Sequence, residues 1–130
     1  MKLDTKSDPL LGAVGGVLIW TAPDHFDKML IFYRDILSLP LRGERTGFAN
    51  FAWGNFKLTL GVHTKVSGVN HDPLRIMVNF LVTDIQGSYE KLRDRNVFFT
   101  RKPEEESWGG WVTTFADPDG NTLQLLQLPD

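Results

Sequence analysis

One order of predicted elements occurs twice along the chain, and this repeat constrains the fold more than any other feature. The repeated order is a strand, a helix and three strands, and such an internal repeat predicts two similar modules that pack about a pseudo-twofold axis. Residue matches support it: Phe51-Ala52, Gly54-Asn55 and Leu58 recur as Phe115-Ala116, Gly120-Asn121 and Leu123, with a small shift in spacing.

In the first half, the pattern predicts a strand, a helix and three further strands. Val14–Thr21 is mostly β-branched or aromatic and ends before a proline, which is typical of a buried strand. Asp24 is the predicted cap of a helix whose apolar residues follow the i, i+3, i+4, i+7 spacing, and Pro40 ends that helix. The three strands are predicted over Leu41–Arg45, Phe48–Trp53 and Phe56–His63, with a hairpin turn at Gly54-Asn55.

The second half repeats this order after a polar stretch rich in Ser, Gly, Asn and Asp. Its last turn, Asp117-Pro118-Asp119-Gly120-Asn121, has well-defined chemistry, because proline suits the second position of a type I turn and glycine tolerates the positive φ that follows. The predicted elements are a strand over Arg75–Thr83, a helix over Ile85–Arg95, and strands over Val97–Arg101, Trp111–Phe115 and Thr122–Leu128.

These elements predict an α+β fold in which two tandem βαβββ modules form a curled mixed sheet with a cleft and carry their helices on the outside. We expect an N-terminal extension over residues 1–11, module 1 over 12–63, a linker over 64–73 and module 2 over 74–130, together one domain. A chain of 130 residues buries roughly two thirds of its unfolded surface, which is enough for a real core.

The composition excludes several classes of function. A net charge of −2 gives no basic surface for nucleic acid or for an anionic membrane. The absence of cysteine excludes disulfides, thiolate nucleophiles and cysteine-bound metals, so that any metal would be held by His, Asp or Glu. The apolar run Leu10–Trp20 contains three glycines and follows no basic segment. We therefore expect neither a signal peptide nor a membrane span, and a cytoplasmic location.

Three motifs resemble the vicinal oxygen chelate superfamily, which includes glyoxalase I, the bleomycin and fosfomycin resistance proteins and the extradiol dioxygenases. Phe32–Pro40 is similar to the F-Y-x-x-x-L-G-L pattern of that family, with Ser38 in place of the usual glycine. Phe80–Asp84 and Phe115–Asn121 match two further motifs, and the resemblance covers residues 12–128. It implies the fold rather than a particular reaction, and often a homodimer, in some members with exchanged modules.

In catalytic members of that family, two residues from each module hold a divalent ion that chelates vicinal oxygens of the substrate. Hard divalent ions prefer carboxylate oxygens, and imidazole is the usual nitrogen ligand. In this chain the four positions fall near Gly16, Val17 or Leu18, near Thr59, on Met77 and on Gln124. The resemblance therefore implies no metal at the usual place and no other cofactor.

Six residues are candidates for lining a ligand site: Met77, Gln124, Thr59, Trp108, Trp20 and His63. Gln124 offers both a donor and an acceptor. His63 is either a half-exposed residue at the end of a strand or a ligand or general base. Trp20, like Trp53, packs either in the core or against a ligand. Trp108 precedes two glycines, which predict either a flexible rim or a bulge.

The remaining charged candidates are expected on the surface. His25 at the start of the first helix and His71 in the linker are predicted to be solvated. Glu104-Glu105-Glu106 is predicted to be a solvated loop, with a general base there as the alternative. Arg75 and Arg101 are either ordinary exposed arginines or positive charges for an anionic ligand.

Two functions of different class follow from these residues. The first is a protein that binds a small organic molecule, apolar or aromatic, in the cleft between the curved sheets without the usual metal. The alternative is a metal-dependent lyase, isomerase or dioxygenase whose divalent ion is held by His63 with Glu44 or one of Glu104 to Glu106. The expected partners are the small-molecule ligand and a second copy of the chain, because exposed strand edges favour pairing in a homodimer.

Overall fold

The computed structural model describes residues 10–130, which fold into two similar modules. Residues 1–9 of the predicted N-terminal extension lie outside the described residues. The prediction of an α+β fold with two tandem βαβββ modules is confirmed. Module 1 contains β1 (Gly16–Thr21), a helical segment made of η1 (Pro23–His25), α1 (Phe26–Ile31) and the π-helical turn η2 (Phe32–Ile36), then β2 (Leu41–Arg45), β3 (Phe48–Trp53) and β4 (Phe56–Val62). Module 2 contains β5 (Met77–Leu81), α2 (Ile85–Asp94), β6 (Phe99–Glu105), β7 (Trp111–Ala116) and β8 (Thr122–Gln127).

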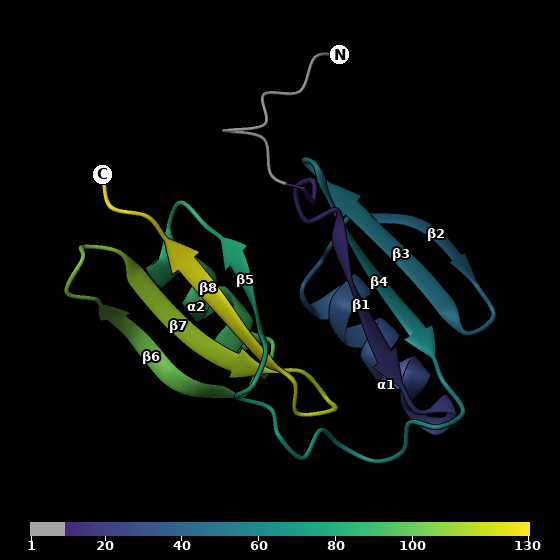
Figure 1. Ribbon diagram of the computed structural model, residues 1–130. Coiled ribbons are helices and arrows are strands. Elements are labelled where there is room, and N and C mark those ends of the chain that lie inside the picture. The colour runs from purple at the N-terminus through teal and green to yellow at the C-terminus, as the bar shows by residue number, and fades with distance from the viewer. Residues whose placement is uncertain (1–9) are drawn as a thin grey trace.

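Each module forms one mixed four-stranded sheet, in the order β1-β4-β3-β2 and β5-β8-β7-β6. In both sheets the first and fourth strands of the module pair in parallel, and the other neighbours pair antiparallel. The two sheets lie side by side with β1 and β5 as the facing edges, and the helices lie behind them (Figure 1). This arrangement leaves the opposite face of each sheet without a helix.

The period-two alternation of the strands decides which side chains meet the helices. Leu58 and Leu60 of β4 are fully buried, and so is Leu123 of β8. They join one core cluster with Met29 and Tyr33 of the helical segment in module 1. Because this cluster contains strands and helices of both modules, the two modules share a single hydrophobic core.

Contacts between the modules lie on the same side as the helices. The rings of Trp53 on β3 and Phe80 on β5 are stacked, with centroids 6.3 Å apart and planes 12° apart. Arg95, which follows α2, donates from Nη1 to the backbone oxygen of Ile36 at 2.7 Å. These contacts fix the two open sheet faces relative to one another.

The first helix begins differently from the prediction. The prediction that Asp24 caps it is wrong: Ala22 is the capping residue, Pro23 occupies the first turn, and no side-chain capping bond is formed. Proline suits that position because its fixed φ matches the helix and its missing N–H would have no partner there. In module 2 the cap is Asp84, whose carboxylate accepts from the backbone N–H of Gly87 at 3.0 Å.

The acidic run also differs from the prediction, because Glu104 and Glu105 belong to β6 rather than to a solvated loop. They pair in register with Val112 and Trp111 of β7. Arg101 contributes to this structure, since its guanidinium donates to Glu104 at 2.6 Å and to Glu106 at 3.1 Å. Among residues 10–130, every helix falls short of the length and apolar character needed to cross a bilayer.

Candidate functional site

The open face of the first sheet mixes apolar, neutral polar and cationic side chains, with Lys57 of β4 and Arg45 of β2 among the last. Leu18 and Trp20 of β1 project from it and are 46% and 39% exposed. Thr59 of β4 lies beside them in register, as the partner of Leu18 on one side and of Asn50 on the other. The Thr59 hydroxyl donates to Asn50 Oδ1 at 2.9 Å. This hydroxyl is therefore already engaged in a bond between neighbouring strands.

An aromatic cluster occupies one end of this face. The Trp20 ring meets Phe48 and His63 edge to face, with centroid distances of 6.1 Å and 5.1 Å. Gly61 lies beneath the first two rings, and a Cβ added there would be 2.9 Å from both. The Nδ1 atom of His63 accepts from the backbone N–H of Lys65 at 3.0 Å. Packing against Trp20 and this bond together orient the imidazole.

The open face of the second sheet brings together Met77 and Gln124. Gln124 of β8 pairs in register with Asn79 of β5 and with Thr114 of β7. Met77 is two residues from Asn79 on β5, so it projects from the same face, and it is 36% exposed. Met77 and Gln124 therefore project from the same face of the second sheet.

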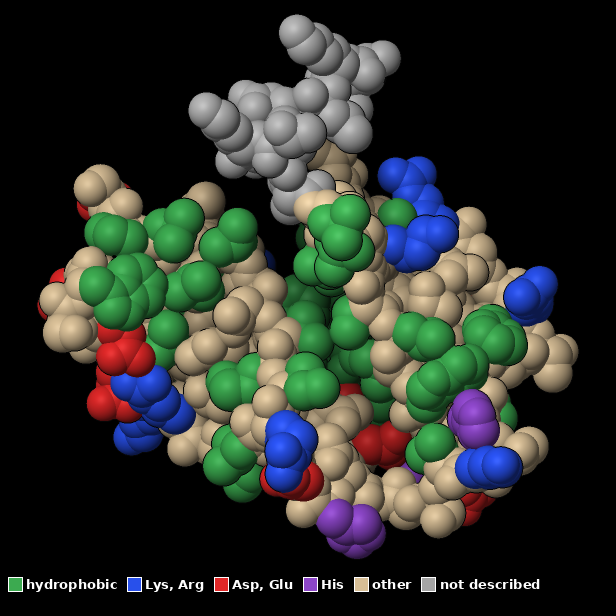
Figure 2. Space-filling model, viewed as in Figure 1, with side chains coloured by type: hydrophobic (Ala, Val, Ile, Leu, Met, Phe, Trp, Pro, Cys, Tyr) green, Lys and Arg blue, Asp and Glu red, His purple; other side chains and the backbone are tan. Residues whose placement is uncertain are grey.

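Figure 2, which has the viewpoint of Figure 1, shows a hollow lined by hydrophobic side chains between the two modules. At one end is a cavity of about 250 Å³, where Trp20 faces linker residues 66–70 together with Asp119 and Asn121. At the other end is a cavity of about 480 Å³ between residues 53–56 and residues 78–81. We call this region between β1 and β5 the inter-module groove.

The six predicted site residues are not all brought together. Trp20, Thr59 and His63 belong to the first open face and its end, whereas Met77 and Gln124 belong to the second. Trp108 lies in the β6–β7 hairpin, over Gly110, at the edge of the second sheet farthest from β1 (Figure 1). Only Trp20 among the six lines one of the two groove cavities.

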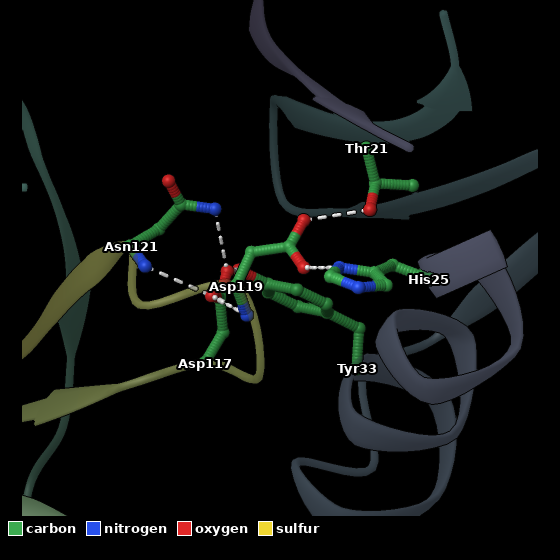
Figure 3. A network of polar contacts seen from close by, with 6 residues as sticks. All are labelled: Thr21, His25, Tyr33, Asp117, Asp119 and Asn121. Carbon is green, nitrogen blue, oxygen red and sulfur yellow. Dashed lines mark hydrogen bonds and ion pairs between the residues drawn. The ribbon is translucent and has the colours of Figure 1, made fainter. Parts of the chain in front are cut away.

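Beneath one end of the groove, Asp119 joins the modules through polar contacts (Figure 3). Its buried carboxylate accepts from the hydroxyl of Thr21, the last residue of β1, at 2.6 Å. The other carboxylate oxygen is 2.8 Å from His25 Nδ1, which makes an ion pair when the imidazole is protonated. We call the contacts of Asp117 and Asp119 with module 1 the polar clasp.

The second half of the polar clasp centres on Asp117. The phenol of Tyr33 is fully buried and donates to Asp117 at 2.6 Å, while Asn121 donates to the same carboxylate from its backbone and its side chain, each at 2.9 Å. Burial raises the pKa of Asp117, against the opposing effect of these donors. Burial, followed by the nearby Asp117 carboxylate, raises the pKa of Tyr33 well above its ordinary value.

Sequence reasoning missed the polar clasp. The prediction that His25 is a solvated surface residue is wrong, because its side chain is only 20% exposed and contacts Asp119. The partners are 94 residues apart, so no local pattern marks the pair. Two acidic residues in a turn beside a hydrophobic strand are the available signal, whereas the sequence prediction uses this turn only for its backbone chemistry and for the family resemblance.

The residues at the four metal positions of the family do not fit a divalent ion. The side chains of Gly16 and Leu18 have no atom that can bind a metal. The Thr59 hydroxyl is engaged in its hydrogen bond to Asn50. Met77 and Gln124 are neutral, whereas hard divalent ions prefer carboxylates. Across residues 10–130 there is no group of three or more His, Asp or Glu side chains arranged to hold an ion.

The charged groups considered earlier as site residues are paired elsewhere. Glu44 accepts from Arg34 at 3.3 Å, and Arg75 donates to Asp72 at 2.6 Å. Arg101 is occupied by two glutamates, as described above. Charged groups nevertheless remain on the first open face: Lys57 lies two residues from Thr59 on β4, and the Arg45 guanidinium lies 5.1 Å from the centroid of the Phe48 ring.

Comparison with known proteins agrees with the fold described above. A family model described as the Glyoxalase/Bleomycin resistance protein/Dioxygenase superfamily matches residues 20–125. The Bacillus subtilis (strain 168) protein described as "Uncharacterized protein YraH" is 26% identical over 117 residues, which cover 81% of this chain and 91% of that protein.

Solved structures share the fold at low sequence identity. A glyoxalase/bleomycin resistance protein/dioxygenase from Nocardioides is 18% identical with a TM-score of 0.78, covering 97% of this chain and 89% of that one. A lactoylglutathione lyase from Agrobacterium tumefaciens is 15% identical with a TM-score of 0.71, covering 92% of this chain and 96% of that one. At this identity the similarity concerns the fold alone.

Replacing Tyr33 with phenylalanine tests the polar clasp. We expect Tyr33→Phe to lower the free energy of unfolding at neutral pH by about 1 to 3 kcal/mol, because a buried carboxylate loses a donor. Above about pH 10 the unfolded wild type releases a phenol proton that the folded state keeps, so its free energy of unfolding falls by up to about 1.4 kcal/mol per pH unit. Tyr33→Phe lacks this contribution. Urea denaturation from pH 7 to 11 measures both effects.

The control for this experiment is Tyr89→Phe, which removes a phenol that donates to no carboxylate among residues 10–130. Its change in the free energy of unfolding shows how much stability is lost when a buried tyrosine hydroxyl is removed without the loss of a bond to a carboxylate. Equal slopes above pH 10 in the wild type and in Tyr33→Phe would contradict the role given to Tyr33.

Substitution of Gly61 tests the aromatic cluster. We expect Gly61→Ala to displace the Trp20 and Phe48 rings, because the new methyl group overlaps both, and to destabilise the fold by about 1 to 3 kcal/mol. Tryptophan emission should shift to longer wavelength, and the shift should vanish when Trp20→Phe is combined with Gly61→Ala. Gly43→Ala is the matched control, since a Cβ there meets no atom within 4 Å. Unchanged emission in Gly61→Ala would show that the rings do not pack over this residue.

Proposed function

This chain belongs to the glyoxalase/bleomycin resistance protein/dioxygenase superfamily, and we propose that it binds a small organic molecule between its two sheets without a divalent ion at the family's usual place. One observation carries the proposal. The positions that would supply metal ligands project from the open faces, yet they present Thr59, Met77 and Gln124, none of which is charged or an imidazole. These neutral side chains suit contact with an organic ligand better than coordination of a hard ion, which supports the proposal.

The chemistry of the open faces indicates the class of ligand. Trp20, Met77 and Leu81 are exposed apolar side chains on the facing edge strands, and Leu81 is 70% exposed. Burying such groups against a flat apolar molecule is favourable, at about 25 cal/mol per Å² removed from water. Gln124 adds a donor and an acceptor beside them. These features favour an aromatic or aliphatic compound with one hydrogen-bonding group.

The alternative is a metal-dependent lyase, isomerase or dioxygenase with an unusual ligand set. It requires His63 to share an ion with Glu44 or with Glu104 to Glu106. Glu44 is paired with Arg34, and Glu104 and Glu106 are paired with Arg101 on β6 of the other module. Glu105 forms no ion pair within residues 10–130, but it lies on β6 of the second sheet, whereas His63 follows β4 of the first. A shared site would require the strands to move and, for the other glutamates, their ion pairs to break, so the binding protein is the function that the geometry supports better.

Metal content and ligand response together separate the two functions. We expect protein purified without chelator to contain less than a tenth of an equivalent of Mn, Fe, Ni or Zn, and its tryptophan emission to change saturably with small neutral aromatics such as 2-naphthalenemethanol. One tightly bound equivalent of metal, lost in His63→Ala, would overturn the proposal in favour of the enzyme. A metal-free protein whose emission responds to none of these compounds would overturn it as well.

Variants of the open faces test where the ligand lies. We expect Gln124→Ala to weaken binding about five- to tenfold, because a ligand group loses its hydrogen-bond partner. Met77→Ala should weaken it by a similar factor through lost apolar contact. Ile31→Ala, at an exposed apolar residue on α1, is the control and should bind as the wild type does. Wild-type affinity in both Gln124→Ala and Met77→Ala would contradict a site on the second open face.

A further inference from the structure

A separate cavity of about 370 Å³ lies between the modules on the side of the helices. Its lining comes from both modules: the segment after η2 and β3 of module 1, and the β5 end, one side of α2, β7 and β8 of module 2. The α2 residues Ser88, Lys91, Leu92 and Arg95 follow the i, i+3, i+4, i+7 spacing, so a continuous stripe of this helix faces the cavity. The cavity is within the size range of small-molecule sites, and it holds the volume of roughly a dozen water molecules.

The floor of the cavity is apolar and well ordered by packing. Phe115 and Leu125 are buried, and Trp53, Phe80 and Leu92 contribute half-buried surface. Trp53 and Phe80 are held in position by their stacked contact. A floor of this kind favours the hydrocarbon part of a ligand.

The rim of the same cavity carries positive charge. Lys91 and Arg95 both line it, and its described lining contains no carboxylate. Within residues 10–130 neither cation forms an ion pair with an acidic side chain. Two full positive charges outweigh the partial negative charge that the nearby end of α2 contributes. An anionic group placed at this rim would therefore meet two cations over an apolar floor.

Ser38 gives the rim a fixed polar group and explains how Arg95 is held. Its φ is +57°, a conformation that favours glycine, and the family pattern has glycine at this position. The structure keeps a serine whose Oγ accepts from Arg95 Nη1 at 3.2 Å, while the same nitrogen donates to Ile36 O at 2.7 Å. The guanidinium is thus anchored at the cavity mouth by module 1.

We propose that this cavity binds a small amphipathic carboxylate, whose anionic group contacts Lys91 and Arg95 and whose hydrocarbon part lies on the Trp53, Phe80 and Leu125 floor. The available volume fits a molecule of roughly ten to fifteen non-hydrogen atoms. Aliphatic and aromatic acids of this size share the required chemistry, an apolar body that ends in one negative charge.

This site is distinct from the inter-module groove, although the two regions share a wall. Trp53, Phe80 and Leu81 line both this cavity and the groove cavity beside β5. The groove cavity has no charged lining residue among those described, whereas this cavity has two cations. The charge of the ligand should consequently decide which of the two regions it enters.

Calorimetric titration at low salt tests the proposal with four compounds. Octanoate and 2-naphthoate represent the aliphatic and aromatic acids, and 1-octanol and 2-naphthalenemethanol are their uncharged counterparts. We expect at least one acid to bind with an affinity that falls about tenfold or more in 0.5 M NaCl, whereas any affinity of its alcohol should not fall. Preference for octanoate or for 2-naphthoate identifies the hydrocarbon class. An acid affinity as insensitive to salt as that of its alcohol, or no binding of either acid at millimolar concentration, would overturn the proposal.

Variants locate the acid in this cavity. Lys91→Gln should weaken acid binding about tenfold, Lys91→Arg should retain it, and Lys28→Gln on the exposed side of α1 should match the wild type. Ser88→Phe fills the cavity and should abolish acid binding, with thermal unfolding measured to show that the variant is folded. Wild-type acid affinity in Lys91→Gln, or loss of acid binding in Gln124→Ala with Lys91→Gln unaffected, would overturn this assignment. Failure of neutral compounds to bind in the groove leaves these measurements unchanged.

Discussion

Each module has one helix for a four-stranded sheet, and a single helix covers only one face of such a sheet. The covered faces of both sheets meet in one core, in which Leu58, Leu123 and Tyr33 are fully buried. The opposite faces keep exposed apolar side chains such as Trp20 and Leu81, and residues 10–130 form no further helix that covers them. The shared core therefore both joins the modules and leaves the surface on which a ligand can bind.

Much of this arrangement could be predicted from the sequence, because it depends on local periodicity. Alternation along β4 and β8 places Leu58 and Leu123 inward, and the same alternation sends Thr59 and Gln124 to the open faces. The repeat order of elements and the final turn depend on residues that are close in sequence. These features were predicted to within a few residues, since strand period and turn chemistry are encoded in short segments.

The interactions that fix one module against the other could not be predicted in the same way. His25 was interpreted from its place at a helix start, whereas its environment is set by Asp119, which is distant in sequence. The stacked contact of Trp53 with Phe80 joins a hairpin end of module 1 to the edge strand of module 2. Glu104 was interpreted from its acidic neighbours, yet pairing with β7 and an ion pair with Arg101 extend the strand through it. Long-range partners decided each of these cases.

The distribution of charge connects the fold to its chemistry. Asp117 and Asp119 are the two acidic residues of the final turn, which lies at one end of the inter-module groove. Both accept hydrogen bonds from module 1 and so hold the modules together. Asp117 accepts from the Tyr33 hydroxyl, from the backbone N–H of Asp119 and twice from Asn121, so this carboxylate has little capacity left to bind a metal or move a proton. The family's metal positions on the open faces thus keep neutral side chains at Thr59, Met77 and Gln124, while Lys91 and Arg95 on the helix side have no acidic partner among residues 10–130. Trp53 and Phe80 line both the cavity beside β5, which has no charged residue in its described lining, and the cavity that Lys91 and Arg95 line, so one aromatic wall separates a neutral cavity from a cationic one.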